Sequence, residues 1–203
     1  MTVAGVEPLS PSSYRSIPWK NGGGVLVAIA TGDSGGDGWG STGVSWHFGR
    51  TSIVAPGPFS DLTGFERLQV VIKGTGLVLV APHEEIDLRH PFRPQRYDGG
   101  TPITTRLENG PVEVVNLIAD RSRFDIDLRV ATTGDQLACR PGVHIVHAPN
   151  GAAVVDVDGI GYDLPADHAL RLQSTGPTVV QVISGRLLIG SICSPGDPVP
   201  SRR

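Results

Sequence analysis

The stretch RLQVVIKGTGLVLVA, residues 67–81, joins two apolar runs through a glycine-containing turn. Successive side chains of a strand point to opposite faces, so Leu68, Val70 and Ile72 would share one face while Arg67 lies on the other. Short runs rich in Val, Ile and Leu that are bounded by glycine are typical of β-strands. The stretch therefore predicts a strand, a turn and a second strand.

The same pattern recurs along the chain. With 27 glycines and 17 prolines in 203 residues, few segments that are long enough for a helix are free of both residue types. Many short strands separated by turn signals predict an all-β sandwich or barrel with little helix. The expected strands are Val25–Ala30, Gly43–Val54, Arg67–Ile72, Leu77–Ala81, Ile103–Leu107, Val112–Ile118, Arg123–Val130, Val143–Ala148, Ala152–Val157, Ala169–Leu172, Thr178–Ile183 and Arg186–Ile189.

A weak internal repeat divides the chain. At an offset of 76 residues, Leu68–Ile72 falls on His144–Ala148. Two stacked copies of one β-unit would give this pattern, although the identities are few and a chance alignment is the alternative. The repeat predicts one half at residues 1–118 and another at 119–193, followed by a loose tail at 194–203.

Among the turn signals, Asn150-Gly151 stands between two apolar runs. Both residue types tolerate positive φ, which the commonest two-residue hairpin turn requires. The pair therefore predicts a tight hairpin.

Composition excludes several classes of partner. A net charge of −3 and only 18% charged residues disfavour a nucleic-acid groove, which needs a basic stripe. No apolar run is long enough to span a membrane, and the start of the chain lacks the regions of a secretory signal. We therefore expect a cytoplasmic protein whose Cys139 and Cys193 are reduced thiols. A homodimer is left open.

The segment PWKNGGG, residues 18–24, is the least ordinary part of the sequence. Three glycines permit either a tight turn or a close approach of a ligand to the backbone. The segment lacks the order GxxxxGK[ST], so a nucleotide phosphate loop is not expected. A plain turn before a strand is one interpretation. The other is a loop in which Trp19 and Lys20 hold a small anionic or planar ligand.

Arg67 begins a strand on the face opposite Leu68. A guanidinium that faces a barrel interior is costly to bury without a partner, and its planar donor fork fits a carboxylate. That carboxylate could belong to a ligand or to the protein itself, with Glu66 and Asp61 as the nearest acids in sequence.

The six histidines give no cupin-type metal signature, because no His-x-His pair followed by a glutamate occurs. His144 and His147 are three residues apart, which on a strand places them on opposite faces. Ser45 and Ser52 have no nucleophile-elbow context. Neither a metal site nor a serine triad is expected.

Several segments, in this order, resemble the HutD/Ves family. The match spans residues 14–121 well and continues more loosely through residue 190. The segments that carry it are Pro18–Gly24 with Ile29-Ala30, Trp46–Ser52, Gly57–Ser60 with Gly64 and Arg67, Lys73–Leu77, and Gly110-Pro111 with Asn116.

The resemblance implies a cupin-like double-stranded β-helix built from two stacked cupin-type halves, a bicupin, with no catalytic metal or other cofactor. It also implies, in one branch, an association with histidine catabolism. There the role would be to bind a pathway intermediate of the urocanate or formylglutamate kind and so to moderate flux. The resemblance makes Trp19, Lys20, Asn21, Arg67 and His47 the ligand-binding candidates.

Two departures from the family pattern concern this pocket. Trp46-His47 stands where the family usually has Trp-Arg, so one positive charge is missing or becomes pH-dependent. Val114-Val115-Asn116 replaces the usual Asp-Phe-Asn, which removes an acid. The preferred ligand is therefore expected to differ.

The resulting hypothesis is a non-enzymatic protein that binds a small carboxylate. Arg67 would clamp the carboxylate and Lys20 would supply charge, while Trp19 would form an apolar wall and Asn21 a hydrogen bond. One alternative is a cupin-type enzyme that acts on a small organic acid in the same pocket. Another is a stress-related protein whose pocket is vestigial and whose surface binds a partner.

Overall fold

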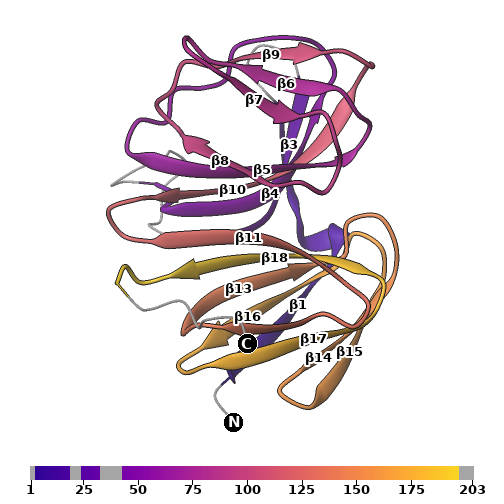
Figure 1. Cartoon of the computed structure of the whole chain (residues 1–203). Coiled ribbons are helices and arrows are strands. Elements are labelled where there is room, and N and C mark those ends of the chain that lie inside the picture. The colour runs from indigo at the N-terminus through magenta and orange to yellow at the C-terminus, as the bar shows by residue number, and fades with distance from the viewer. Residues whose placement is uncertain (1–2, 19–23, 33–42, 197–203) are drawn as a thin grey trace. The chain divides into compact units, whose positions relative to one another are not determined.

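The computed structural model describes residues 3–18, 24–32 and 43–196 (Figure 1). Within these ranges the chain forms β-strands and a single 3-10 turn, Pro11–Ser13. The all-β fold predicted from the short glycine-bounded runs is confirmed. The described residues contain no helix that is long and apolar enough to cross a membrane.

The chain divides into two compact units. The first unit is Tyr14–Ser122, and the second combines Met1–Ser13 with Arg123–Arg203. The N-terminal strand β1 (Val3–Leu9) belongs to the second unit because it pairs with β16 (Ala169–Ser174). The second unit is therefore assembled from both ends of the chain.

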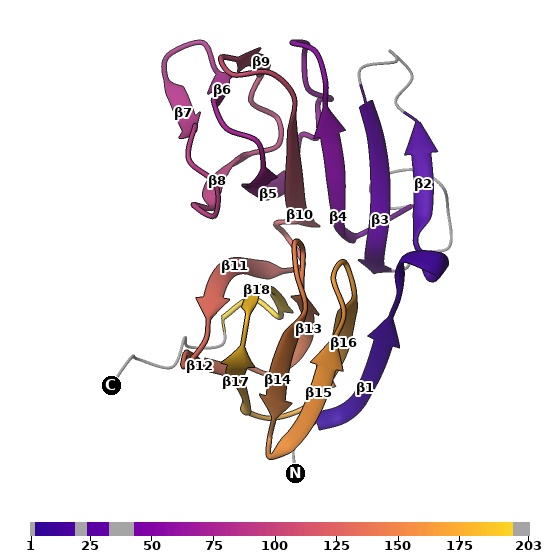
Figure 2. The same ribbon diagram turned by 90° about the vertical axis from the view of Figure 1, so that its right-hand side faces the viewer.

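The first unit consists of a six-stranded and a three-stranded antiparallel sheet. Figure 2 shows β2, β3, β4 and β10 of the larger sheet side by side. In spatial order the larger sheet holds β2 (Arg15–Pro18), β3 (Gly24–Gly32), β4 (Trp46–Ile53), β10 (Val112–Asp120), β5 (Phe65–Lys73) and β8 (Gln95–Asp98). The smaller one holds β7 (Glu85–Leu88), β6 (Leu77–Val80) and β9 (Thr104–Leu107).

The core of the first unit fills the space between these sheets. Side chains of one face of the larger sheet pack against the inward side chains of the smaller sheet, with the partly buried Phe59 beside them. The buried members of this core are Ile53, Val71, Leu77, Leu79, Ile86, Leu88, Tyr97, Ile103, Val112 and Val114.

The second unit has a five-stranded and a four-stranded sheet. The first holds β1, β16, β13 (Gly142–His147), β18 (Arg186–Cys193) and β11 (Asp125–Thr132), in that order. The second holds β12 (Gln136–Cys139), β17 (Thr178–Ser184), β14 (Ala153–Val157) and β15 (Ile160–Leu164). Its core is apolar apart from one thiol and consists of Ala131, Cys139, Val146, Ala148, Ala153, Val155, Val157, Leu164, Leu170, Leu172, Val180, Val182, Leu187 and Ile189.

The two units repeat one order of pairings. In the first, β4, β10, β5 and β8 are neighbours, and β6 lies between β7 and β9. In the second, β11, β18, β13 and β16 are neighbours, and β14 lies between β15 and β17. Each series follows the same sequence order of strands, so the second unit reproduces the connectivity of the first.

The predicted offset of 76 residues holds for β6 and β7, where the paired core residues Leu77 and Leu88 correspond to Ala153 and Leu164. For β5 and β10 the offset differs by one residue. Val71 pairs with Val114 in the first core, and Val146 pairs with Ile189 in the second. Both steps, from 71 to 146 and from 114 to 189, are 75 residues rather than 76. A slip of one residue reverses the faces of a strand, so for β5 the predicted alignment placed inward residues on outward ones.

The hairpin predicted at Asn150-Gly151 was wrong. The strands on either side of it, β13 and β14, lie in different sheets, so this segment crosses between sheets. A two-residue hairpin occurs instead at Asp158-Gly159, where Val157 pairs with Ile160. Both turn residues have positive φ, 51° and 89°, as that turn requires.

Six strands were not predicted: β1, β2, β7, β8, β12 and β15. Most are only four or five residues long, and several carry many polar residues. In β7, for example, the buried Ile86 and Leu88 alternate with the exposed Glu85 and Asp87. Such short amphipathic strands are fixed by their pairing partners rather than by an apolar run.

Cys139 and Cys193 are both buried and are not joined in a disulfide. Burial raises the pKa of the Cys139 thiol to about 11. That side chain is therefore a protonated thiol at neutral pH and packs as a small apolar group.

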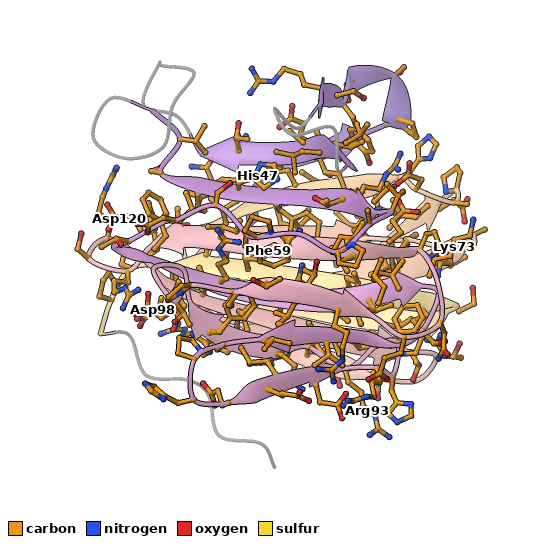
Figure 3. All side chains as sticks on the ribbon, turned by 90° about the horizontal axis from the view of Figure 1, so that it is seen from above. His47, Phe59, Lys73, Arg93, Asp98 and Asp120 are labelled. Carbon is orange, nitrogen blue, oxygen red and sulfur yellow. The ribbon has the colours of Figure 1, made fainter. Side chains whose placement is uncertain are left out.

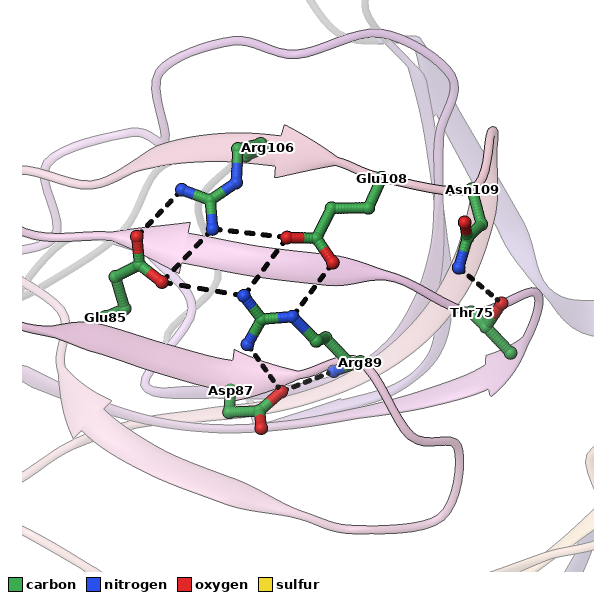
Figure 4. Close-up of polar contacts among 7 residues, drawn as sticks. All are labelled: Thr75, Glu85, Asp87, Arg89, Arg106, Glu108 and Asn109. Atoms are coloured by element: carbon green, nitrogen blue, oxygen red, sulfur yellow. Dashed lines mark hydrogen bonds and ion pairs between the residues drawn. The ribbon is translucent and has the colours of Figure 1, made fainter.

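The outward face of the three-stranded sheet carries an ion-pair network, which we call the outer ion network (Figure 4). Arg106 donates to both oxygens of Glu85 at 2.8 and 3.1 Å and to Glu108 at 3.2 Å. Arg89 donates to both oxygens of Glu108 at 2.8 and 3.0 Å, and its Nη1 lies 3.3 Å from Asp87. Hydrogen bonds from these arginines are the main cause of the lowered pKa values of Glu85 and Glu108.

The outer ion network stands over a buried valine. Val78 pairs with Asp87 on one side and with Arg106 on the other, and it is fully buried although it points to the outward face. The long arginine side chains are well suited to cover such an apolar surface with their carbon stems.

We expect Arg106→Gln to lower the melting temperature at low salt, because it removes ion pairs to Glu85 and Glu108. The difference from the wild type should shrink at about 1 M salt, where the screening length is only about 3 Å. The difference should also shrink below about pH 4, where Glu85 and Glu108 begin to be protonated and lose their ion pairs with the arginines. Melting curves in a salt and pH series measure this. A deficit that salt does not change would mean that the network acts by packing alone.

Candidate functional site

The register of the six-stranded sheet aligns four residues from four strands. Arg67 on β5 pairs with Ile118 on β10 and with Tyr97 on β8, while Ile118 also pairs with His47 on β4. Directly paired residues of a sheet share a face. The row therefore runs His47, Ile118, Arg67, Tyr97.

A second polar row lies beside the first. Gln69 on β5 pairs with Asn116 on β10, which pairs with Gly49 on β4. One step further along, Val71 and Val114 belong to the apolar core, and Thr51 pairs with Val114. The inner face of this sheet is thus apolar at one end and polar at the other.

We call the buried polar side chains of this face the polar cluster. Between 1% and 8% of each residue's surface is exposed. In Figure 3, which looks onto this unit, His47 and Phe59 lie toward the middle, whereas the charged Lys73, Arg93, Asp98 and Asp120 lie at the margin. The polar cluster consists of His47, Thr51, Arg67, Gln69, Tyr97 and Asn116.

Arg67 is the permanent charge of the polar cluster. Its Nη2 donates a hydrogen bond of 2.7 Å to the carbonyl oxygen of Ser60, and its guanidinium carbon lies 5.5 Å from the centroid of the Phe59 ring. Its buried Nε has no hydrogen-bond partner among the described residues. The segment Gly57–Ser60 supplies these two contacts, and the Tyr97 side chain is hydrogen-bonded to the guanidinium as well.

Neither of the acids proposed from sequence neutralises Arg67. Glu66 pairs instead with Arg96, and Asp61 accepts hydrogen bonds from the backbone and hydroxyl of Thr63. No carboxylate of the described residues forms an ion pair with Arg67. The buried cation is held by a carbonyl, an aromatic face and the Tyr97 side chain, which leave its Nε–H available as a donor.

Tyr97 and Gln69 border the guanidinium. The Tyr97 hydroxyl donates a hydrogen bond of 3.0 Å to Oε1 of Gln69. Burial raises the pKa of Tyr97 to about 12, although the neighbouring Arg67 acts in the opposite direction. Tyr97 is therefore a neutral phenol.

His47 lies at the other end of the row. Burial, assisted by the positive charge of Arg15, lowers the pKa of His47 to about 4, so its imidazole is neutral at neutral pH. The ring lies against Gly49: a Cβ at that position would stand 2.4 Å from Nε2 of His47 and 2.4 Å from the Val27 carbonyl oxygen. Glycine is thus required at residue 49 by a close approach rather than by a turn.

The structure brings together two of the five predicted ligand-binding residues. Arg67 and His47 share the inner face, with Ile118 between them. Trp19, Lys20 and Asn21 lie outside the described residues, so their part in the site stays a prediction. In sequence they follow β2, whose partner β3 pairs with β4.

Sequence reasoning missed the remaining members of the polar cluster. The alternation along the strand already placed Gln69 beside Arg67. Tyr97 lies on β8, a short polar strand that was not predicted. Asn116 and Thr51 stand in apolar strands, where their Nδ2 and Oγ1 atoms are 3.4 Å apart. A polar residue at an inward position of a predicted strand was the signal that could have found them.

The second unit has no counterpart of Arg67. With the 75-residue step of the repeat, residue 67 corresponds to Gly142, where a Cβ would stand 2.5 Å from the Ile192 carbonyl oxygen. The position equivalent to Gln69 is His144, whose two ring nitrogens contact Ser191 Oγ at 2.9 Å and the Arg140 carbonyl oxygen at 2.8 Å. In the second unit the position equivalent to Gln69 therefore holds a histidine whose two ring nitrogens both have partners within the protein.

The described residues contain no group of three or more histidine, cysteine or acidic side chains placed to hold a metal ion. His144 and His147 lie on opposite faces of β13: His144 pairs with Ser191, while His147 contacts Asp167 at 3.2 Å. The two histidines therefore do not act together.

Comparison with known proteins identifies the family. The HutD family model matches residues 11–188. An uncharacterized 21.2 kDa protein in the hutC 3′ region of Pseudomonas putida is 31% identical over 190 residues, which are 93% of this chain and 98% of that protein. The structure of HutD from Pseudomonas fluorescens SBW25 superposes with a TM-score of 0.78 at 25% identity, over 95% of this chain and 100% of that one.

The fold also matches a Cupin 2 conserved barrel domain protein from Leptotrichia buccalis. The TM-score is 0.54 at 11% identity, over 96% of this chain and 98% of that one, a likeness that concerns the fold alone. The cupin-like β-barrel fold predicted through the family resemblance is thereby confirmed. With a family model that spans most of its length and a relative of similar size, this chain belongs to the HutD family.

Proposed function

We propose that this chain is a non-enzymatic protein that binds a small carboxylate and thereby moderates histidine catabolism. The observation that carries the proposal is the buried guanidinium of Arg67. One of its nitrogens bonds to a carbonyl, its Nε has no partner among the described residues, and no described carboxylate neutralises it.

A carboxylate is the natural complement to such a group. The five N–H donors of arginine form a rigid planar fork that matches the two oxygens of a carboxylate, and the resulting charge-assisted bonds give both affinity and orientation. A buried cation without an anion is costly, so an anionic ligand would also remove part of that cost.

The histidine pathway enters through the relatives. The P. putida protein is described by its position in the hutC 3′ region. Together with membership of the HutD family, this position supports acids of the urocanate or formylglutamate class as ligands. Because Gly142 stands at the position equivalent to Arg67, the proposal includes one ligand for each chain.

The first test is a thermal-shift screen with urocanate and N-formylglutamate, followed by calorimetric titration of any stabilising acid. A ligand at about 100 times its Kd stabilises by about 2.7 kcal/mol, which in a chain of this size raises the melting temperature by about 5–10 °C. We expect at least one acid to do so with a stoichiometry of one. Failure of every carboxylate at millimolar concentration would remove the proposal.

The competing function is catalysis on the same acid. NMR spectra of the acid, taken before and after incubation with stoichiometric protein, separate the two functions. A binding protein returns the acid unchanged, whereas a cupin-type enzyme converts it.

A further inference from the structure

We infer that His47 makes the site selective for acids that carry a single negative charge. This inference rests on the proposed carboxylate function of Arg67 and names the substrate class of the same site. It follows from the geometry of one row of the sheet and from the charges that the row contains.

The geometry sets where the two ends of a ligand would lie. Arg67 and His47 stand on strands that are separated only by β10, so their backbones are two strand spacings apart, about 9–10 Å. Between them lies the buried apolar side chain of Ile118. An acid whose carboxylate meets Arg67 and whose body lies over Ile118 would direct its far end toward His47.

The charges at the two ends differ. Arg67 is a permanent cation, whereas the pKa of His47, lowered to about 4 mainly by burial, leaves its imidazole neutral. Arg15 on β2 contributes to this lowering, and its side chain is exposed. Tyr97, with a pKa of about 12, is also neutral. The other members of the polar cluster are an alcohol and two amides, so the described cluster carries one positive charge and no negative one.

This distribution favours one carboxylate and a neutral polar far end. A second carboxylate beside His47 would meet no buried cation among the described residues, because Arg15, whose charge acts on His47, is exposed. Burying that carboxylate would therefore cost more than burying a neutral group that is hydrogen-bonded. A neutral imidazole has one donor and one acceptor nitrogen, so its chemistry complements an amide, an imidazole or a hydroxyl. Discrimination thus arises from the charge that this end of the row lacks.

The position of the imidazole is set by the backbone. It lies against Gly49, where even a methyl group would overlap with both the His47 ring and the Val27 carbonyl oxygen. The absence of a side chain at residue 49 therefore leaves the space that the His47 ring occupies.

The test uses acids of equal shape that differ by one charge. Glutarate and succinate are dianions at pH 7.5, and their monoamides, glutaramate and succinamate, are monoanions. We expect calorimetric titration of the wild-type protein to show at least about tenfold tighter binding of the monoamide in the pair that binds. Urocanate against N-formylglutamate is the third comparison, with one carboxylate against two.

The matched variant is His47→Arg, which places a second cation at the far end. We expect the preference for the monoamide to fall by at least about tenfold or to reverse. Gln136→Arg, at an exposed position of β12 in the second unit, adds the same charge elsewhere and should leave the preference unchanged. Melting curves verify that both variants are folded.

Two results would overturn the inference while leaving the proposed function intact. One is a wild-type protein that binds the dianion as tightly as its monoamide, a comparison that needs no variant. The other is a folded His47→Arg protein with an unchanged ratio. If no acid binds at all, the proposed function itself fails, and the inference fails with it.

Discussion

Replacing Arg67 by methionine is expected to remove most of the response to carboxylates while leaving the ligand-free protein at least as stable as the wild type. Loss of one partner of a buried, hydrogen-bonded charge pair costs about 2–5 kcal/mol. That corresponds to at least about 30-fold weaker binding. At about 100 times the wild-type Kd, an acid should then stabilise the variant by less than about 1 kcal/mol, against about 2.7 kcal/mol for the wild type.

The stability half of this prediction follows from the surroundings of Arg67. The guanidinium is buried without a carboxylate among the described residues, so folding bears the cost of its desolvation. Methionine is of similar length, flexible and apolar, and it can fill the same space. The change leaves the Ser60 carbonyl oxygen without its donor, which offsets part of the gain. We expect a net change between zero and about 2 kcal/mol in favour of the variant.

The control is Arg96→Met on the neighbouring strand β8. Arg96 pairs with Glu66 and is exposed, so its removal should neither stabilise the protein nor affect binding. Urea unfolding and calorimetric titration of the three proteins measure both effects. A destabilised Arg67→Met protein that still binds the acid would show that Arg67 is a structural residue.

His47→Gln is expected to remove most of the loss of stability that the wild type suffers between pH 6.5 and 4. The pKa of His47 is lowered to about 4 in the folded protein by burial and by Arg15, whereas that of an unfolded histidine is about 6.5. Between pH 6.5 and pH 4 residue 47 is therefore protonated in the unfolded chain and mostly neutral in the folded protein. Stability is therefore full above pH 6.5, falls as the pH drops, and by pH 4 is lower by on the order of 3 kcal/mol.

Urea unfolding at several pH values measures this slope. Glutamine keeps a hydrogen-bonding group at residue 47 but does not titrate, so its slope over this range should be much flatter. His144, whose pKa is also lowered mainly by burial, leaves a residual slope of the same sign. His83→Gln, at an exposed position, should reproduce the wild-type slope. Equal slopes for His47→Gln and the wild type would mean that His47 is protonated in the folded protein.

Much of the fold was legible in local sequence. Apolar runs such as those of β5 and β10 combine high strand propensity with burial, so they can be predicted without knowing which strands they pair with. The strands β7 and β8 cannot be predicted in this way, because they are short and their buried residues alternate with more exposed polar ones. The hairpin at Asp158-Gly159 also carried a recognisable signal, whereas Asn150-Gly151 carried an equally good one and crosses between sheets. The residues of a turn predict that the chain turns there, but they do not predict whether the two flanking strands pair with each other.

The candidate site was legible only in part. Alternation along the strand placed Arg67 and Gln69 on one face, opposite Leu68, and the family resemblance added His47. The partner of Arg67 could not be chosen from sequence, because Glu66 and Asp61 lie close to it along the chain and could pair with it as well as a ligand could. Their side chains are engaged elsewhere, with Arg96 and Thr63, and only coordinates show this.

The sequence by itself determined that this chain is built of short strands, that it belongs with HutD proteins, and that Arg67 and Gln69 share one face of a strand. These properties depend on composition, alternation and local motifs. The tertiary structure decided the register, since a pairing that shifts by one residue exchanges every inward and outward side chain. That register places His47, Ile118, Arg67 and Tyr97 in one row and puts Gly142 where the second unit would need an arginine. Burial lowers the pKa of His47 to about 4, so its imidazole is uncharged at neutral pH, whereas the guanidinium of an arginine stays protonated in proteins.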